Sequence, residues 1–324
     1  MDLEVHPALP SPDCVALVRE AEELGFDTIW FADSHMIWRD AFVIMGAVAA
    51  AGGTINIGTG VSNTITRHPT VVASALATLE QLRPGRVLCG LGIGDSSVYT
   101  LGLKPMKRRV LEQHVALMRA LWRKEPCRGE NGHAIALDWL EHPVDIPVYY
   151  GSSGPKMLRD GGRLCDGVVS YVGLTPERVR IALGHIEAGA SASGRRLSDI
   201  ALVWWVPFNV SPDATQARAG VKPHVARAIL HAEPLGLPDD EQAVAAELKG
   251  QYDWYEHMAA GSEHSRIVPD RMVERYAVAG TPPECVEQLR RLQACGIDHV
   301  GIIPMGSDRR AIIQLFAKSV LPRL

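Results

Sequence analysis

The sequence lacks the features that mark several common classes of protein. Its six cysteines form no Cys-X-X-Cys pair, and its basic residues form no long run. No apolar stretch reaches the roughly 18 residues needed to span a membrane. With a net charge of −4, we expect neither a nucleic-acid partner nor a membrane partner. The cysteines are typical of reduced thiols in a cytoplasmic protein, with a Cys285–Cys295 disulfide as the alternative.

Several catalytic and targeting motifs are also missing. There is no His-Glu-X-X-His or other cluster at metal-ligand spacing, so we expect no metal, and there is no Gly-X-Ser-X-Gly nucleophile elbow. The glycine-rich segment GLGIGD, residues 90–95, has Asp where a dinucleotide-binding turn needs its third glycine. The first ten residues, MDLEVHPALP, carry acids and no long apolar core, which does not resemble a signal peptide.

What is present is a regular alternation of short apolar strands and amphipathic helices. The expected strands are residues 3–5, 28–32, 55–58, 86–92, 146–150, 167–171, 200–206 and 299–303. A helical pattern follows each of them, and strand 86–92 is apolar on both faces, as a buried parallel strand is. Eight such units in one chain predict an α/β fold, a (β/α)8 TIM barrel that forms a single domain over residues 1–324.

One segment does not fit this alternation. Residues 211–280 are too many for a single loop, and they contain helical patches such as EQAVAAELKGQYDWYEHM. We interpret the segment as an insertion after strand seven, which either covers the pocket or makes a subunit contact.

A small, bare turn follows the fifth strand. Its residues are Gly151, Ser152, Ser153 and Gly154, and Pro155 then opens a helix at a position where its missing N–H costs nothing. Backbone N–H groups and serine hydroxyls at a helix N-terminus favour a bound anion. The turn therefore fits a phosphate site, although an ordinary strand-to-helix turn has similar residues.

Polar residues also follow the second strand. Asp33 comes at the strand end, where TIM barrels place site residues, although it could equally cap a short turn. His35 is a candidate proton donor or an ordinary loop histidine. Trp38 fits the wall of a pocket for a flat ring, or simple packing on the rim.

The next two strand ends carry small and polar residues. After strand three come Gly60, Val61, Ser62 and Asn63, and after strand four come Asp95, Ser96 and Ser97. Glycines allow a ligand to approach the backbone closely, and paired carboxylates with serines suit hydrogen bonding to a polar heterocycle. Arg67, further along the loop after strand three, fits a brace of that loop better than an anion ligand.

Three segments together resemble the luciferase-like monooxygenase superfamily. They are GTGVSNTITRHPTVVASALATLEQL, VLCGLGIGDSS and VYYGSSGPKMLRDGGRLCDGVV, in the family's order and spacing. Within the superfamily the chain looks like methylene-tetrahydromethanopterin reductases and other deazaflavin-dependent oxidoreductases. The resemblance covers most of the chain and is weakest over residues 211–280.

The resemblance implies roles for these residues. It implies a cis peptide between Gly60 and Val61 behind the flavin ring, with Ser62 and Asn63 beside it. Asp33, Asp95 and Ser96 would bind the polar edge of the ring. The turn Ser153-Gly154-Pro155 would hold the cofactor phosphate. Relatives carry Asp-His after strand two, whereas here Ser34 takes the place of that histidine and His35 follows.

These expectations lead to a function with two alternatives. The leading hypothesis is an oxidoreductase that transfers hydride between the deazaflavin coenzyme F420 and a small organic substrate. Trp38 would form the wall on the substrate side, and the pocket floor would consist of His6, Trp38, Trp204 and the insertion. The alternatives are an FMN-dependent monooxygenase that uses reduced flavin and oxygen, and a flavin-binding barrel without catalysis. Because relatives are often dimers, we expect a homodimer.

Overall fold

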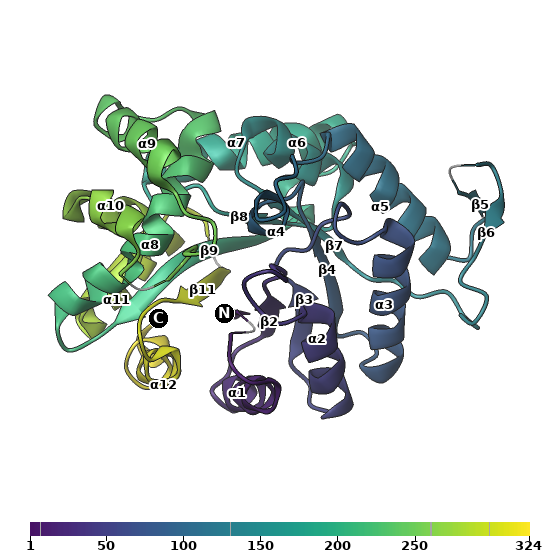
Figure 1. The fold of residues 1–324 in the computed structure, drawn as a ribbon, viewed down its shortest axis with the longest axis horizontal. Helices are drawn as coiled ribbons and strands as arrows, with labels where there is room; N and C mark the ends of the chain where they lie inside the picture. The colour runs from purple at the N-terminus through teal and green to yellow at the C-terminus, as the bar shows by residue number, and fades with distance from the viewer. Residues whose placement is uncertain (7, 130, 260, 298) are drawn as a thin grey trace. The chain divides into compact units, whose positions relative to one another are not determined.

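The computed structural model describes residues 1–6, 8–129, 131–259, 261–297 and 299–324 (Figure 1). The chain forms two compact units. Unit 1 consists of Met1–Glu4, Glu23–Phe26 and Gly151–Leu324, and unit 2 consists of Val5–Glu22 and Asp27–Tyr150.

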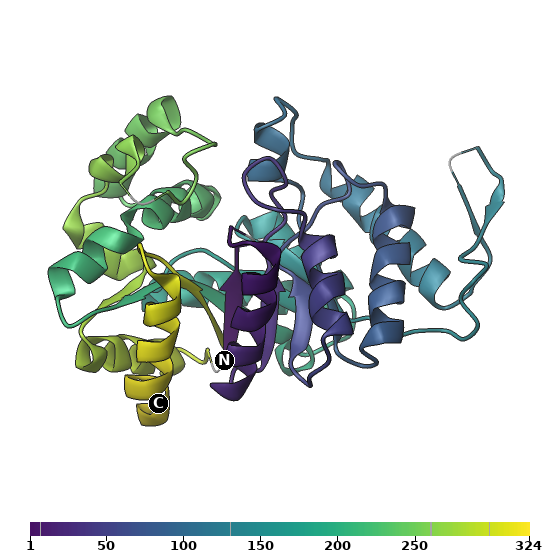
Figure 2. The same ribbon diagram turned by 60° about the horizontal axis from the view of Figure 1, so that its bottom comes forward.

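Unit 2 is a run of parallel strands with helices packed beside them. The strands lie in the order β2 (Thr28–Phe31), β3 (Asn56–Thr59), β4 (Val87–Leu91) and β7 (Val148–Ser152). The helices are α1 (Ser11–Glu23), α2 (Ala41–Ala50), α3 (Pro69–Leu82), α4 (Ser96–Tyr99) and α5 (Arg108–Trp122). Figures 1 and 2 show α2, α3 and α5 side by side, and an antiparallel hairpin of β5 (Cys127–Arg128) and β6 (Ala134–Ile135) that extends away from them.

Local sequence explains where these helices begin and what they bury. Asp40 caps α2 by accepting a hydrogen bond from the N–H of Val43 at 3.1 Å, and Pro69 opens α3 at its first turn. In α5 the buried residues recur every three or four positions and end at Trp122, whose indole donates to the carbonyl of Ala73 at 3.0 Å. Trp122 therefore ties α5 to α3.

A bulge interrupts β3 next to β4. After Thr59 the peptide bond between Gly60 and Val61 is cis, which confirms the expectation from the resemblance. The chain then rejoins β4, because the N–H of Ser62 donates to the carbonyl of Gly90 at 2.9 Å. A Cβ atom on Gly90 would overlap the carbonyl oxygen of Thr59 and would lie 3.1 Å from a methyl of Val61. Glycine is thus required in β4 to make room for the bulge of β3.

Unit 1 is organised around the long strand β9 (Ala201–Val210). One edge of β9 pairs with β8 (Gly167–Ser170) and then, further along, with β10 (Val278–Gly280). The other edge pairs with β11 (Val300–Pro304), which in turn pairs with β1 (Asp2–Val5). The helices of this unit are α6 (Pro155–Leu164), α7 (Pro176–Ala192), α8 (Ala214–Ala232), α9 (Asp239–Gln251), α10 (Asp270–Tyr276), α11 (Pro282–Gln293) and α12 (Arg309–Ser319). Short 3-10 turns are η1 (Leu197–Asp199), η2 (Glu233–Leu235), η3 (Glu263–Ile267) and η4 (Leu321–Arg323).

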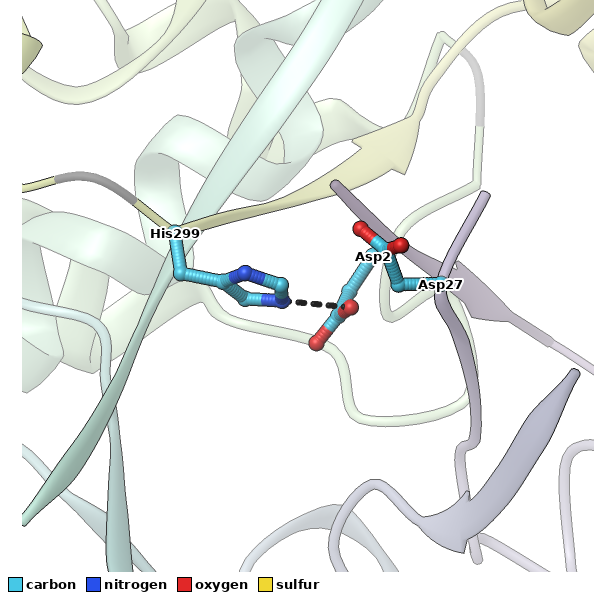
Figure 3. Close-up of side chains that lie close together, drawn as sticks. All are labelled: Asp2, Asp27 and His299. Atoms are coloured by element: carbon cyan, nitrogen blue, oxygen red, sulfur yellow. Dashed lines mark hydrogen bonds and ion pairs between the residues drawn. The ribbon is translucent and has the colours of Figure 1, made fainter. Parts of the chain in front are cut away.

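The start of β1 is fixed by a polar contact within unit 1. The Nε2 atom of His299, just before β11, lies 2.6 Å from a carboxylate oxygen of Asp2 (Figure 3). Because Asp2 is 1% exposed, this contact gives a buried carboxylate a hydrogen-bonding partner.

The segment that we expected to be an insertion, residues 211–280, contains α8, η2, α9, η3, α10 and β10. A buried ion pair joins this segment to the rest of unit 1: Arg178 of α7 donates to Glu241 of α9 at 2.7 Å. Glu241 is fully buried and also accepts from Arg275 of α10 at 2.8 Å. The segment ends in β10, a strand that the sequence did not predict. Its role as a cover or a subunit contact stays a prediction.

The strand–helix alternation over both units is that of the predicted (β/α)8 barrel. Each of the eight predicted strands is present within a few residues of its expected bounds, and β5, β6 and β10 are additional. None of the six cysteines is in a disulfide, so the Cys285–Cys295 alternative is not formed, and burial raises the pKa of Cys285 to about 12. Among the described helices, none combines the length and apolar composition needed to cross a membrane.

We expect Gly90→Ala to destabilise the protein by at least about 2 kcal/mol, because the new methyl group overlaps the backbone of Thr59. Urea unfolding followed by circular dichroism measures the change. Gly184→Ala is the matched control: it lies in α7 with open space around it, and should be neutral or stabilising by up to about 1 kcal/mol. Equal stability of the Gly90→Ala protein and the wild type would contradict the packing argument.

Candidate functional site

A buried carboxylate lies at the end of β2 in unit 2. Asp33 is 3% exposed, and its Oδ2 atom accepts hydrogen bonds from the hydroxyl of Ser62 at 2.6 Å and from Nε of Arg67 at 3.3 Å. Its other oxygen, Oδ1, is buried and has no hydrogen-bond partner among the residues that the structure describes. A buried acceptor without a partner is costly, so this atom fits an N–H or O–H donor from a ligand.

Arg67 braces the loop around Asp33. Its Nη2 atom lies 2.5 Å from Asp40, and its guanidinium stacks on the ring of Phe42 at 4.6 Å. Burial alone would lower the pKa of Arg67, but the hydrogen bonds and charges of Asp40 and Asp33 raise it. Arg67 thus stays charged and holds two acids of different elements, as the sequence suggested.

The loop after β3 places Ser62 and Asn63 differently. Ser62 is directed at Asp33, as described above. The side chain of Asn63 instead serves the loop itself: its Oδ1 accepts from the N–H groups of Ile65 and Thr66, each at 2.9 Å, and its Nδ2 donates to Ser97 at 2.9 Å. Asn63 and Ser97 therefore contribute to the shape of the loops, and binding of a ligand by them stays a prediction.

The ends of β2 and β4 are joined by serines. Ser34 and Ser96 are both buried, and their hydroxyl oxygens lie 2.6 Å apart. Asp95 stands just before α4, half-buried, and its side chain does not cap that helix. The structure thus brings the predicted residues Asp33, Ser62 and Ser96, together with Ser34, to one set of strand ends.

The aromatic and imidazole groups near this set have distinct surroundings. Trp38 stacks on His6, with ring centroids 4.5 Å apart and an angle of 16° between the planes. His6 is 4% exposed, whereas Trp38 is half-buried. His35 is half-buried in the turn after Ser34 and forms no hydrogen bond with any described residue.

The predicted phosphate turn belongs to unit 1. Strand β7 ends at Ser152, whose hydroxyl donates to the carbonyl of Met157 at 3.3 Å. Gly154 is the N-cap of α6, Pro155 is the first helical residue, and no side chain caps the first turn. This end of α6 therefore offers its dipole to an anion without competition from a capping side chain.

The sequence analysis missed a group of histidines on α8 beside this turn. The Nδ1 atom of His231 lies 3.2 Å from the hydroxyl of Ser153. Tyr171, directly after β8, packs edge-on against His231 and His224, and its hydroxyl donates to the carbonyl of His224 at 2.7 Å. A sequence signal did exist, since residues 224, 227 and 231 are His, Arg and His at helical spacing.

Glu4 is a second residue that the sequence analysis passed over. It lies in β1, is 5% exposed, and burial raises the pKa of its carboxyl to about 8, although the charge of Arg309 lowers it. Burial also lowers the pKa of His224 well below the ordinary value, with the nearby His257, His231 and Arg309 acting in the same direction. At neutral pH this part of unit 1 therefore holds a neutral acid and a neutral imidazole.

Comparisons with known proteins fit this arrangement. The sequence model of the luciferase-like monooxygenase family matches residues 4–299, so the chain belongs to that family. It is 29% identical to the 5,10-methylenetetrahydromethanopterin reductase of Archaeoglobus fulgidus, over 99% of this chain and 98% of that protein. It is 30% identical to the F420-dependent glucose-6-phosphate dehydrogenase of Beutenbergia cavernae, over 96% of this chain and 93% of that protein.

Solved structures confirm the fold. The coenzyme F420-dependent tetrahydromethanopterin reductase of Methanopyrus kandleri superposes with a TM-score of 0.82 at 24% identity, over 99% of this chain and 98% of that chain. An F420-dependent secondary alcohol dehydrogenase, solved with an F420–acetone adduct, superposes with a TM-score of 0.78 at 21% identity, over 99% of this chain and 98% of that chain. The (β/α)8 barrel predicted from the sequence is thus the fold of the chain.

The raised pKa of Glu4 predicts a pH-dependent stability. In the unfolded chain this carboxyl loses its proton near its ordinary value of 4.5, but in the folded chain it does so only near 8. Stability should therefore fall as pH rises between these two values. Because Glu4→Gln stays neutral, it does not lose this stability. Its free energy of unfolding, relative to that of the wild type, should therefore increase by more than about 1 kcal/mol from about pH 5 to about pH 8.

Urea unfolding of both proteins at the two pH values measures this difference. Glu247→Gln, at an exposed position of α9, is the matched control and should show no such change. A constant difference between the Glu4→Gln protein and the wild type at both pH values would show that Glu4 ionises normally in the folded protein.

Proposed function

We propose that this enzyme transfers a hydride between coenzyme F420 and a small organic substrate. The structural observation that carries the proposal is the buried Oδ1 atom of Asp33, an acceptor without a described partner beside the cis peptide of β3. The sequence relatives support the choice of cofactor, since those named above are an F420-dependent dehydrogenase and a methylenetetrahydromethanopterin reductase.

The residues of unit 2 fit the ring of such a cofactor. A deazaflavin carries N–H and O–H donors on its polar edge, which match the free acceptor of Asp33. Gly60 and Val61 would lie behind the ring, with Ser62 holding Asp33 in place through its 2.6 Å hydrogen bond. Arg67 holds the carboxylate of Asp33 in place through its 3.3 Å contact without needing to touch the ligand.

The residues of unit 1 fit the cofactor's phosphate. Ser152, Ser153 and Gly154 precede a helix whose first turn no side chain caps. The hydroxyl of Ser153 and backbone N–H groups of this turn would donate to phosphate oxygens, which the helix dipole also favours. A serine turn of this kind holds an anion without adding a fixed charge, so it positions the cofactor through geometry.

When bound, the deazaflavin supplies a carbon centre that accepts or gives a hydride and reacts poorly with oxygen. The protein's part is to orient the ring, exclude water and hold a proton. Glu4 suits the last role because its carboxyl keeps its proton up to about pH 8. His35, which the sequence gives as a candidate proton donor or an ordinary loop histidine, stays a candidate for the same role.

We infer that two copies of the chain associate through α2 and α3 in unit 2. Helix α2 has the sequence AFVIMGAVAA, which is apolar on every face, yet Val43 is 68% exposed. Val71 at the start of α3 is 54% exposed. An apolar surface of this kind is expected to be covered in the assembled protein.

Val43→Asp should therefore shift the protein from dimer to monomer in sedimentation velocity, because it places a charge on this surface. Leu101→Asp, at a loop position that is 42% exposed, is the matched control and should leave the assembly unchanged. A wild type that sediments as a monomer would refute the inference.

The wild-type protein should bind F420 at least about tenfold more tightly than FMN. Quenching of cofactor fluorescence measures both affinities, and an oxygen electrode measures oxygen uptake with each cofactor reduced. Tighter binding of FMN together with substrate-dependent oxygen consumption would favour the monooxygenase alternative. Binding of F420 without turnover of any alcohol, aldehyde or imine would favour the alternative without catalysis.

One variant links this binding to the proposed site. Asp33→Asn keeps the size of the side chain but removes its charge and its double acceptor character. We expect weaker F420 binding with little change in melting temperature, since Arg67 keeps its contact with Asp40. A large loss of melting temperature with unchanged binding would show that Asp33 has only a structural role.

A further inference from the structure

The end of α8 lies directly against the phosphate turn. His231, in the last turn of α8, contacts the hydroxyl of Ser153 at 3.2 Å, although the two residues are 78 positions apart. Just after α8, Pro234 of η2 lies near Gly154: a Cβ added to Gly154 would be 3.4 Å from the Cβ of Pro234. Two residues of this segment therefore border the turn.

The contact between His231 and Ser153 has two possible directions. If Nδ1 carries no hydrogen, it accepts the hydroxyl hydrogen of Ser153, and that hydrogen is then turned away from any ligand in the turn. If the imidazole is protonated, Nδ1 must donate to the Ser153 oxygen, because both ring nitrogens then carry hydrogens. The hydroxyl hydrogen of Ser153 is then free to point at an anion.

We propose that His231 is a positioning residue for the cofactor phosphate: as an imidazolium it donates to Ser153, frees the Ser153 hydroxyl for a phosphate oxygen, and adds a positive charge beside the turn. This inference rests on the proposed function, because it assumes that the turn holds the phosphate of F420. It deepens that function by assigning to α8 a part in binding that no residue of the turn can supply.

The groups around His231 include aromatic, basic and acidic side chains. Tyr171 approaches it edge-on, with ring centroids 5.5 Å apart, and offers no positive charge. His224, seven residues earlier on α8, is kept neutral by burial, which lowers its pKa well below the ordinary value. Glu233, which follows α8, is exposed to solvent and paired with Lys249 of α9 at 2.5 Å. Arg227, one turn before His231 on α8, carries a positive charge that disfavours an imidazolium at position 231, and a bound phosphate would offset that charge.

The consequence is a dependence of cofactor affinity on pH. Binding of an anion stabilises the charged imidazole, so affinity should rise as pH falls through the range in which histidine titrates, around pH 6.5. The phosphate of F420 is a diester, which gains no proton in this range. The acidic hydroxyl of the deazaflavin ring is also present in the phosphate-free riboside, so a change in affinity that F420 shows and the riboside lacks comes from groups of the protein beside the phosphate.

Fluorescence quenching by the wild-type protein at about pH 5.5 and about pH 8 tests this inference. We expect F420 to bind roughly tenfold more tightly at the lower pH, the effect of one added charge-assisted hydrogen bond. The same deazaflavin riboside without its phosphate should bind with no such difference. His231→Gln can still donate to Ser153 but cannot become charged, so its affinity for F420 should be the same at both pH values.

Controls separate a specific effect from unfolding. His142→Gln changes an exposed histidine and should keep the wild-type pH dependence. Thermal melting followed by circular dichroism verifies that each variant is folded. Ser153→Ala should lose the pH dependence as well, because it removes the group through which His231 acts.

The outcomes distinguish this inference from the proposed function. If the wild type binds F420 and the His231→Gln protein keeps the full pH dependence, the role of His231 is wrong while the proposed cofactor stands. If the wild type binds only FMN, the proposed cofactor is wrong, and the difference between wild type and His231→Gln on FMN decides the role of His231. If neither cofactor binds, both proposals are wrong.

Discussion

The contact on which the structure around β2 and β3 depends is the hydrogen bond from Ser62 to the buried carboxylate of Asp33. A carboxylate that is 3% exposed is stable only where other groups compensate its charge, and Ser62 and Arg67 do so on one oxygen. To reach Asp33, Ser62 must follow the bulge of β3. The bulge in turn needs Gly90 in the neighbouring strand, because any side chain there would overlap Thr59.

This chain of requirements accounts for residues that are otherwise puzzling. The GLGIG segment resembles a nucleotide-binding turn but has a steric purpose, since Gly90 and Gly92 both lie close to the side chain of Val61. Arg67 resembles an anion ligand but is fully engaged with Asp33 and Asp40. Of the two carboxylate oxygens of Asp33, Oδ1 has no hydrogen-bond partner among the described residues, which is why the proposed binding of the ring centres on this atom.

In unit 1, the turn that we propose for the phosphate differs from the site around Asp33 because it has no buried charge of its own. The turn itself is neutral, and basic groups approach it from α8, an element of the segment 211–280. That segment is anchored by the buried pair of Arg178 and Glu241, in which each charge depends on the other. The pair joins α7 to α9, whereas His231 of α8 approaches the turn through its contact with Ser153, and the turn itself keeps small side chains.

The sequence by itself determined the local features of this protein. Apolar runs and proline or aspartate at helix starts are local signals, so the strands, the helix at Pro155 and the barrel class could be predicted from them. The resemblance to a known family added the cis peptide at Gly60. The short strands β5, β6 and β10 could not be predicted, because two or three residues carry no readable pattern.

Tertiary structure alone decided which polar groups meet and how they ionise. Nothing near Asp33 in the sequence shows that Ser62 and Arg67 compensate it, and Ser153 is 78 residues from His231. Glu4 was read as an ordinary strand residue, yet its carboxyl keeps its proton to about pH 8. The physical reason is that desolvation and hydrogen bonding depend on neighbours brought in from distant parts of the chain, whereas strand and helix formation depend on adjacent residues.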